Sequence, residues 1–262
     1  MVGGNIMGKV IAIISQKGGV GKTTTAVNLG ASLAALKQNT LILGHDPQCG
    51  VGVSFGLEHK SNGRGLYNFY LGEIPLKAAR KSTRMDNLDI IPCNVTSSEE
   101  ELSLLRIISG DIFRLKSNLY GLRKEYDYII IDCPPTLGTI TTASLVASDS
   151  FIVPLQLDAF SLNTLGRVIK TARSIKTNYN PALKIEGFLL TMVDPQVKLT
   201  KQILDETRKN LKNKVFKTII PRHPSLAEVS QTRKPVIFID VMSIGSRAYL
   251  QLAREIIENN QP

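Results

Sequence analysis

The segment SQKGGVGKTTT, residues 15–25, combines glycines, two lysines and adjacent threonines in a pattern suited to holding phosphate. Glycines let successive backbone N–H groups turn towards one anion, and a helix that starts there adds partial positive charge. Lys22 is expected to reach the β- and γ-phosphates of a nucleotide, and the Thr23 hydroxyl to ligate Mg²⁺. The residues predicted to bind nucleotide here are Lys17, Gly18, Gly19, Val20, Gly21, Lys22, Thr23 and Thr24.

A second lysine, Lys17, stands five residues before Lys22, although one lysine is enough to hold a phosphate. The first glycine of the common phosphate-loop pattern is also missing, because Gln16 occupies its position. The loop is therefore a variant of that pattern. Taken alone, Lys17 is equally consistent with an ordinary surface lysine.

Two aspartates end apolar segments elsewhere in the chain. Asp46 ends NTLILGHD, and Asp132 lies within EYDYIIIDCPP. Ligand sites of α/β proteins form at the carboxyl ends of strands, and a phosphate-cleaving site needs acids that hold Mg²⁺ and orient water. The alternative is that each aspartate only caps a turn.

The loop and both aspartates need a framework of strands. Short apolar runs rich in β-branched residues predict buried strands, and helical spacing, clearest in the amphipathic stretch 199–213, predicts helices between most of them. We expect an α/β fold with a single doubly wound, mostly parallel sheet and helices on both faces. One domain is expected over residues 1–262, with residues 1–8 disordered and with surface loops at 60–65 and 95–101. The predicted strands are 9–15, 39–46, 88–94, 125–135, 150–156, 184–194 and 217–222.

Composition indicates a globular protein with an anionic partner. Hydrophobic residues make up 43% of the 262 residues, and no apolar run is long enough to predict a membrane-spanning helix. The three cysteines are widely spaced, which favours a reduced, cytoplasmic protein. Of the net charge of +10, residues 161–235 carry the whole excess, with 15 Lys or Arg against 5 Asp or Glu. Nucleic acid is the commonest such partner, and solvated helix faces are the alternative.

The segment KGGVGKTT resembles the deviant Walker A motif of the ParA/MinD ATPases. The resemblance extends over nearly all of the chain, through DPQ at residues 46–48, IIIDCPP, GFLLTMVD, IPRHPSLAE and KPVIFIDVMSIGSRAYLQLARE, and it favours the ParA/Soj branch. It implies a P-loop NTPase fold and hydrolysis of ATP with Mg²⁺. It also implies an ATP-dependent sandwich homodimer, in which Lys17 contacts phosphate bound to the other subunit.

The resemblance gives roles to further residues. It makes Lys17, Lys22 and Asp46 catalytic, with Asp46 positioning the attacking water, and it implies that Asp132 holds Mg²⁺ through water. It places Thr191, Met192, Pro221 and His223 near the adenine, although relatives usually have Asn where His223 stands.

Three departures from the family pattern stand out. Gly44 replaces the first aspartate of Asp-x-Asp-Pro-Gln, which could slow hydrolysis or weaken Mg²⁺ binding. Cys49 and Gly50 replace the usual Gly-Asn. The two arginines that often contact DNA align near Gln196 and Ser225. The basic residues left nearby as DNA-binding candidates are Lys198, Lys201, Arg222 and Arg233.

The resemblance therefore implies an ATP-hydrolysing switch that binds DNA non-specifically, is stimulated by a ParB-like or other adaptor protein, and partitions chromosomes, plasmids or another cargo. A cytoplasmic, nucleoid-associated location follows. The alternatives are a MinD-like or non-DNA positioning ATPase, a weakly hydrolysing dimerisation module, and a relative of dethiobiotin synthetase. No stable membrane anchoring is expected, since the last helical turns carry Arg254, Glu255 and Glu258 and little basic surface.

Overall fold

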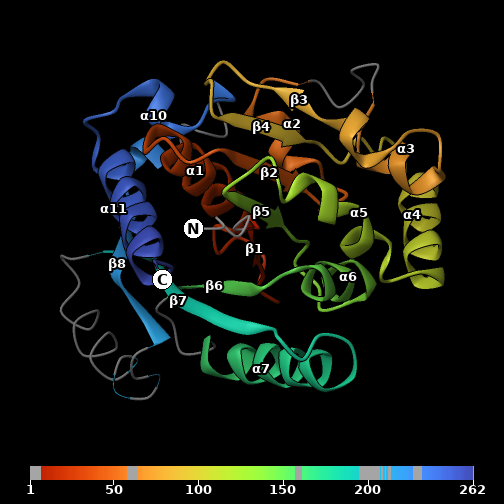
Figure 1. Cartoon of the computed structure of the whole chain (residues 1–262). Helices are drawn as coiled ribbons and strands as arrows, with labels where there is room; N and C mark the ends of the chain where they lie inside the picture. Colours follow the sequence, from red (N-terminus) through yellow and green to blue (C-terminus); the bar gives the residue numbers. More distant parts are fainter. Residues whose placement is uncertain are drawn as a thin grey trace, which may run out of the picture.

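A single eight-stranded sheet organises the molecule, with strands in the order β3-β4-β2-β5-β1-β6-β7-β8 (Figure 1). The computed structural model describes residues 7–57, 64–156, 161–194, 207, 209, 211, 214–226 and 232–261. Every strand pair is parallel except β3 with β4. The predicted α/β class, with a mostly parallel sheet and helices on both faces, is confirmed. The prediction for residues 1–8 falls largely outside the described residues.

Seven of the eight strands are those that the apolar runs predicted. They are β1 (Lys9–Ile13), β2 (Thr40–Gly44), β4 (Leu88–Ile91), β5 (Tyr128–Asp132), β6 (Ser150–Gln156), β7 (Lys184–Val193) and β8 (Val215–Pro221). Their apolar runs are nearly continuous because helices bury both faces of a parallel sheet. The eighth, β3, is the two-residue strand Lys81–Ser82, which pairs antiparallel with β4 and carries no apolar run. It was not predicted.

The helices divide between the two faces of the sheet. The face with α1 (Lys22–Ala35) also carries α2 (Gly50–Ser54), α10 (Val236–Ile239) and α11 (Ile244–Asn259). The opposite face carries α3 (Leu66–Leu71), a 3₁₀ turn (Leu76–Ala79), α4 (Ser98–Gly110), α5 (Arg114–Leu122), α6 (Thr139–Ala147) and α7 (Ser161–Asn178). The chain thus crosses from one face to the other around the sheet, as a doubly wound fold requires.

The surface loop predicted at 95–101 is wrong in its second half, because α4 already begins at Ser98. Ser97 Oγ accepts a hydrogen bond from the backbone N–H of Glu100 at 3.2 Å, and the Glu100 carboxylate accepts one from Thr96 N at 2.6 Å. This is a variant of the serine-to-glutamate capping pattern that marks a helix start, with Glu100 bonded to the residue before the N-cap. The predicted loop at 60–65 and the amphipathic helix at 199–213 lie almost wholly outside the described residues.

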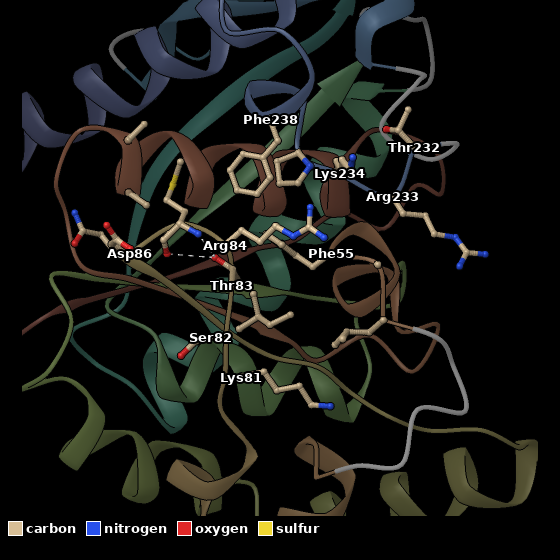
Figure 2. Close-up of a pocket in the computed structure, with 18 of the residues that line it drawn as sticks. Phe55, Lys81, Ser82, Thr83, Arg84, Asp86, Thr232, Arg233, Lys234 and Phe238 are labelled. Carbon is tan, nitrogen blue, oxygen red and sulfur yellow. Dashed lines mark hydrogen bonds between the residues drawn. The ribbon is translucent and has the colours of Figure 1, made fainter.

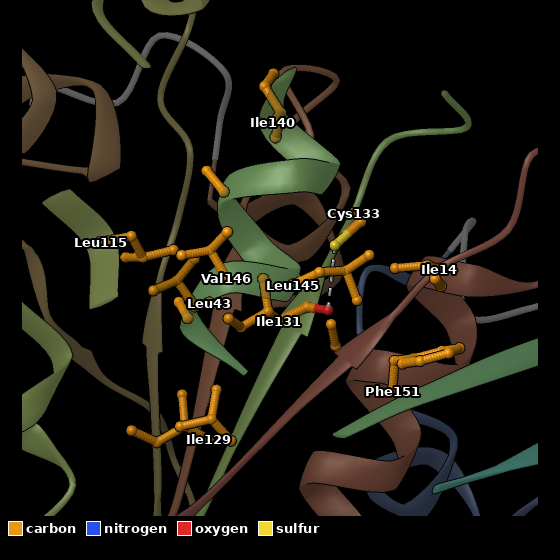
Figure 3. Packing of buried hydrophobic residues seen from close by; sticks show 14 of the residues in the cluster. Ile14, Leu43, Leu115, Ile129, Ile131, Cys133, Ile140, Leu145, Val146 and Phe151 are labelled. Carbon is orange, nitrogen blue, oxygen red and sulfur yellow. Dashed lines mark hydrogen bonds between the residues drawn. The ribbon is translucent and has the colours of Figure 1, made fainter. Parts of the chain in front are cut away.

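The core behind the site is dense and apolar. Figure 3 shows Ile14, Leu43 and Ile131 from the strand side meeting Leu145 and Val146 of α6. All five side chains are fully buried. The three cysteines are buried as well. Among the described helices, none is long and apolar enough to cross a membrane. Such packing fixes the strand ends that carry the polar residues.

Candidate active site

The three polar motifs come together at the carboxyl ends of neighbouring strands. In the sheet register, Asp132 of β5 lies between Ile13 of β1 and Gly44 of β2. The glycine-rich loop continues directly from β1, and Asp46 follows β2 by two residues. This arrangement agrees with the prediction that the three segments share one site.

The backbone of the loop has the shape of a phosphate cradle. Gly19 and Gly21 have φ angles of 74° and 87°, in the left-handed region that residues with a Cβ rarely adopt. Gly21 caps α1 without any side-chain hydrogen bond, and the first turn of α1 carries no acidic residue. The first N–H groups of a long helix therefore point outwards without side-chain partners, and this is the arrangement that attracts an anion.

Lys22 lies almost buried within the cradle. Its side chain is 7% exposed, and its Nζ donates a hydrogen bond to the backbone oxygen of Lys17 at 3.2 Å. Burial lowers the pKa of Lys22, while the charges of Asp132 and Asp46 raise it in part. The backbone of Lys17 thus holds Lys22. Lys17 itself is half-buried, and its N–H donates to Ser15 Oγ at 3.3 Å.

Thr23 and Asp132 form the candidate metal-binding pair. The Thr23 hydroxyl donates a hydrogen bond to Asp132 Oδ2 at 2.7 Å. Asp132 is fully buried, and burial raises its pKa to about 7, with the Asp46 charge adding to the rise and Thr23 and Lys22 opposing it. Its Oδ1 atom is buried and has no hydrogen-bond partner among the described residues. An unused carboxylate oxygen beside a threonine hydroxyl fits Mg²⁺ held through water.

The rest of the donor set also fits magnesium. Within the described ranges, no group of three or more His, Cys, Asp or Glu side chains could enclose a metal ion. Mg²⁺ keeps several waters and is usually bound by one or two protein oxygens together with substrate phosphates. Thr23 and Asp132 supply that small number of oxygens beside the phosphate cradle, so the residues present fit Mg²⁺ bound with a nucleotide.

Asp46 is held next to this pair with its carboxylate 8% exposed. Its Oδ1 accepts a hydrogen bond from Gln48 N at 3.0 Å, and its backbone oxygen accepts one from Cys49 N at 2.9 Å. Burial raises the pKa of Asp46, while the Gln48 N–H and the charge of Lys22 lower it. A carboxylate fixed at one oxygen and reachable by solvent can orient a water molecule.

The position of the missing aspartate is closed by packing. A Cβ placed on Gly44 would lie 3.1 Å from the Cβ of Val51 in α2. Gly50 sits equally close to the loop, since a Cβ there would lie 2.8 Å from Thr23 Cγ2. Cys49 adopts a φ of 55°, a conformation that glycine takes at less cost. The departures at 44, 49 and 50 therefore lie together, where α2 packs against the site.

His45, next to Asp46, was not singled out from the sequence. Its ring is fully buried, with Nδ1 2.7 Å from Ser144 Oγ and Nε2 3.0 Å from the Tyr70 hydroxyl. Ser144 donates its own proton to Ile140 O, so Nδ1–H donates to Ser144 and Tyr70 donates to Nε2. Burial lowers the pKa of His45 to about 3. Nothing in the sequence indicated these partners, which come from α3 and α6.

The residues predicted near adenine lie at the carboxyl edge of β7 and β8. Thr191 Oγ1 donates to the backbone oxygen of Val20 at 3.0 Å, which joins β7 to the phosphate loop. Met192 has a φ of 54°, and Pro221 pairs with Val193 at the end of β8. His223 accepts a hydrogen bond from Ser225 N at 3.3 Å. Their contact with adenine stays a prediction.

The four DNA-binding candidates are not brought together in the described part of the chain. Lys198 and Lys201 lie outside the described residues. Arg222 is exposed directly after β8, at one edge of the sheet. Arg233 is exposed as well, but it lines a hollow together with Lys81 of β3, at the other edge.

Comparisons with known proteins show the family of this chain. A protein-family model described as an AAA domain matches residues 8–185. The sporulation initiation inhibitor protein Soj of Bacillus subtilis is 41% identical over 97% of this chain and 100% of the relative. The chromosome partitioning protein ParA of Myxococcus xanthus is 39% identical over 98% of this chain and 90% of its own length.

Solved structures with the same fold hold nucleotide. Cobyrinic acid a,c-diamide synthase from Mycobacterium smegmatis, with bound ADP and magnesium, is 28% identical with a TM-score of 0.81, covering 97% of this chain and 95% of that one. The septum site-determining protein MinD from Pyrococcus horikoshii, complexed with Mg-ADP, shares the fold at 24% identity and a TM-score of 0.78, over 95% and 96% of the two chains. The chain belongs to the AAA domain family, as a P-loop ATPase of its ParA/Soj branch.

Proposed function

We propose that this ATPase is a nucleotide-dependent switch that closes as a sandwich homodimer on ATP, binds DNA without sequence preference and reopens after hydrolysis. One observation carries the proposal. The Thr23–Asp132 pair, Lys22 and Asp46 surround one phosphate cradle whose loop also contains the extra lysine, Lys17. The output is the partitioning of a chromosome, plasmid or other cargo, in keeping with the names of the relatives.

The residues of the cradle have separate tasks in hydrolysis. The loop N–H groups and Lys22 hold the phosphates, and Lys22 exchanges its bond to Lys17 O for a phosphate oxygen. Thr23 and Asp132 would hold Mg²⁺, which would neutralise charge on the phosphates. Asp46, fixed through Oδ1, orients the attacking water. The raised pKa of Asp46 makes its carboxylate a better proton acceptor for this water.

Lys17 completes the site from the other subunit in this proposal. A second cation near the γ-phosphate stabilises charge that develops during phosphoryl transfer. Supplying that cation from a partner makes dimerisation depend on ATP. The family resemblance and the presence of two lysines in one loop support this role. The closed arrangement of two subunits is the part that the experiment below must establish.

DNA binding rests on charge. Residues 161–235 carry a net charge of +10, and cations neutralise DNA phosphates without reading bases. We propose Lys198, Lys201 and Arg222 as phosphate contacts, and an adaptor protein of ParB-like type as the stimulator of hydrolysis. Such a protein acts at the nucleoid in the cytoplasm.

Stable membrane anchoring through α11 is not part of this proposal. Leu252 and Ile256 of α11 are fully buried in the core. Glu255 accepts hydrogen bonds from Lys217 N at 2.7 Å and Thr218 N at 2.9 Å, which fastens the helix to β8. A helix committed to the sheet in this way has no free apolar face for lipid.

Gel retardation of non-specific duplex DNA tests the proposed switch. Wild type, Lys17→Ala and the control Lys116→Ala are compared with ATP, with ADP and without nucleotide. We expect salt-sensitive retardation with ATP alone, lost in Lys17→Ala and kept in Lys116→Ala, which changes an exposed lysine of α5. Retardation that ignores nucleotide, or none at all, would contradict the proposal.

A weakly hydrolysing version of the switch has one specific observation in its favour. The Cβ of an aspartate at position 44 would lie 3.1 Å from the Val51 Cβ, so Val51 would have to shift for the family's first aspartate to fit. Phosphate release measured with and without DNA separates the two versions. A rate that stays at the buffer background under both conditions would favour a dimerisation module.

A further inference from the structure

A second concave site lies away from the phosphate loop, between the end of α1, the β3–β4 turn and the segment before α10 (Figure 2). Its volume is about 940 Å³, which falls within the range of small-molecule sites in proteins. We call it the basic hollow. Nothing in the proposed ATPase cycle uses it.

The hollow gathers five cations from three separate segments. They are Lys37, Lys81, Arg84, Arg233 and Lys234, with Asp86 as the one acidic side chain among the residues that line it. None of the five makes an ion pair with a carboxylate of the described residues. An excess of charge of one sign around one hollow attracts the opposite charge, so a polyanion is bound favourably there.

The floor between these cations is apolar and partly flat. Phe55 and Phe238 pack edge to face with ring centroids 6.5 Å apart, and both remain half-buried. Pro235 and Met85 extend this floor. Asn87 lines the same hollow, and its side-chain amide makes no hydrogen bond to any described residue, so it offers both a donor and an acceptor. A flat heteroaromatic group finds stacking surface and an edge partner here.

The wall that carries Arg84 is preorganised. Thr83 Oγ1 donates to Leu88 O at 2.8 Å and accepts from Met85 N at 3.1 Å, which closes the turn between β3 and β4. On another side, Lys37 has a φ of 64° because it ends α1, where Gln38 N donates to Leu33 O at 3.1 Å, so its backbone is fixed by the helix cap. Arg233 also lies in the left-handed region, with a φ of 53°.

From these observations we infer that the basic hollow binds a free nucleotide that carries at least two phosphate groups, separately from the nucleotide of the phosphate loop. The phosphates lie among the cations, and the base lies on Phe55 and Phe238. An extended acidic peptide fits less well, because β3 offers an edge of only two residues for main-chain pairing. Duplex DNA is too wide to enter a hollow of this volume and reaches only its rim.

Calorimetric titration of the whole chain tests the inference. The phosphate loop, whose buried site should bind first, is filled with one equivalent of Mg-ADP per chain so that none is left for the hollow, and guanosine 3′,5′-bisdiphosphate is then added. We expect one further equivalent to bind per chain. The double variant Arg84→Ala/Lys234→Ala should weaken binding about tenfold or more, since it removes two charge-assisted contacts. Lys116→Ala, the matched control, should change it by less than about twofold.

Two further arms test the ligand class. Phe238→Leu should weaken binding of the nucleotide but leave binding of inorganic pyrophosphate unchanged, because only the nucleotide has a base that stacks on the ring. A single-stranded oligonucleotide, duplex DNA and a polyglutamate peptide are titrated in parallel. The inference is overturned if no second equivalent binds, if pyrophosphate binds as tightly as the nucleotide, or if the hollow variants weaken only the macromolecules. Because Mg-ADP occupies the phosphate loop throughout, these outcomes are independent of the proposed switch.

Discussion

The phosphate loop and the basic hollow place their charges in opposite ways. In the loop, Lys22, Asp46 and Asp132 are each less than 10% exposed and interact with one another between three strands. In the hollow, Arg84, Arg233 and Lys234 are exposed and have no anionic partner among the described residues. Buried charges of both signs hold one another in a fixed geometry. Exposed charges of one sign attract an oppositely charged ligand, which neutralises them when it binds.

The largest effect is expected from Lys22→Met, which keeps the length of the side chain and removes its charge. ATP hydrolysis should fall about a hundredfold or more, because a preorganised cation at the phosphates is lost from a buried site. Steady-state phosphate release measures this. Arg84→Ala is the matched control from the hollow, and it should keep the wild-type rate. Equal losses in both variants would erase the distinction between the two regions.

The pH dependence of stability should differ between the two regions, because the groups with strongly shifted pKa values lie in and beside the buried site. The pKa of His45 is lowered to about 3, so its contribution to stability is present above pH 6.5 and is lost as the pH falls. The pKa of Asp132 is raised to about 7, so its contribution is complete below pH 3.8 and is lost as the pH rises. Between pH 3.8 and 6.5 the two groups change the stability in opposite directions. The two slopes therefore cancel in the wild-type protein.

Single variants should reveal the two opposed slopes in nucleotide-free protein. Relative to wild type, His45→Gln should gain stability towards low pH by about 1.4 kcal/mol per pH unit. Asp132→Asn should gain it towards pH 7 with a similar slope of about 1.4 kcal/mol per pH unit. Urea unfolding at several pH values measures both. Parallel profiles for all three proteins would mean that neither group is buried as described.

Gly44→Asp is expected to have an intermediate effect. Restoring the family's aspartate should destabilise the protein by about 2 kcal/mol, because the new Cβ meets Val51 and the packed α2 must move. The added carboxylate also stands in register with Asp132. Adding Val51→Ala should recover little of this loss, because alanine keeps the Cβ that the new side chain meets and removes only the Cγ2 contact at 3.4 Å. Thermal unfolding of the single and double variants decides, and a Gly44→Asp protein as stable as wild type would contradict this packing.

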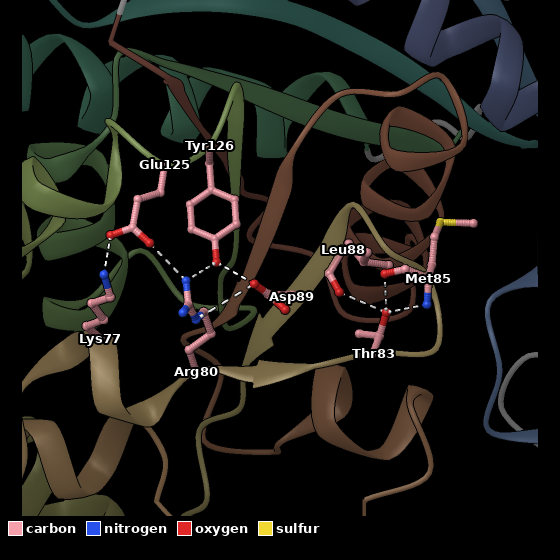
Figure 4. Close-up of polar contacts among 8 residues, drawn as sticks. All are labelled: Lys77, Arg80, Thr83, Met85, Leu88, Asp89, Glu125 and Tyr126. Carbon is pink, nitrogen blue, oxygen red and sulfur yellow. Dashed lines mark hydrogen bonds and ion pairs between the residues drawn. The ribbon is translucent and has the colours of Figure 1, made fainter.

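The smallest effects are expected at exposed cations. Figure 4 shows Lys77 and Arg80 paired with Glu125, and Arg80 also with Asp89, next to the strand that borders the hollow. Lys77→Ala should cost less than about 1 kcal/mol, because exposed ion pairs contribute little. Arg84→Ala, which breaks no ion pair, should leave stability unchanged or slightly higher. Urea titration of both compares a partnered cation with an unpartnered one.

The same contrast explains what the sequence could predict. The phosphate loop, Asp46 and Asp132 belong to continuous segments in which residue spacing follows the chemistry. Seven strands were predicted because each has its own apolar run. The hollow could not be predicted, since its cations come from three segments that only the fold brings together. β3 depends on pairing with β4, and the environment of His45 depends on α3 and α6, so neither is visible in local sequence.

Subunit mixing tests the central claim, that Lys17 completes the site of a partner, most directly. Lys17→Ala lacks the donated lysine and Asp46→Ala lacks the water-positioning carboxylate, so neither should hydrolyse ATP alone. In a mixed dimer, the Lys17→Ala subunit keeps its own Asp46 and receives Lys17 from its partner. An equal mixture should therefore recover about one quarter of the wild-type rate, since half of the dimers have one working site. A mixture as inactive as its components would show that Lys17 acts within its own subunit and would contradict the account.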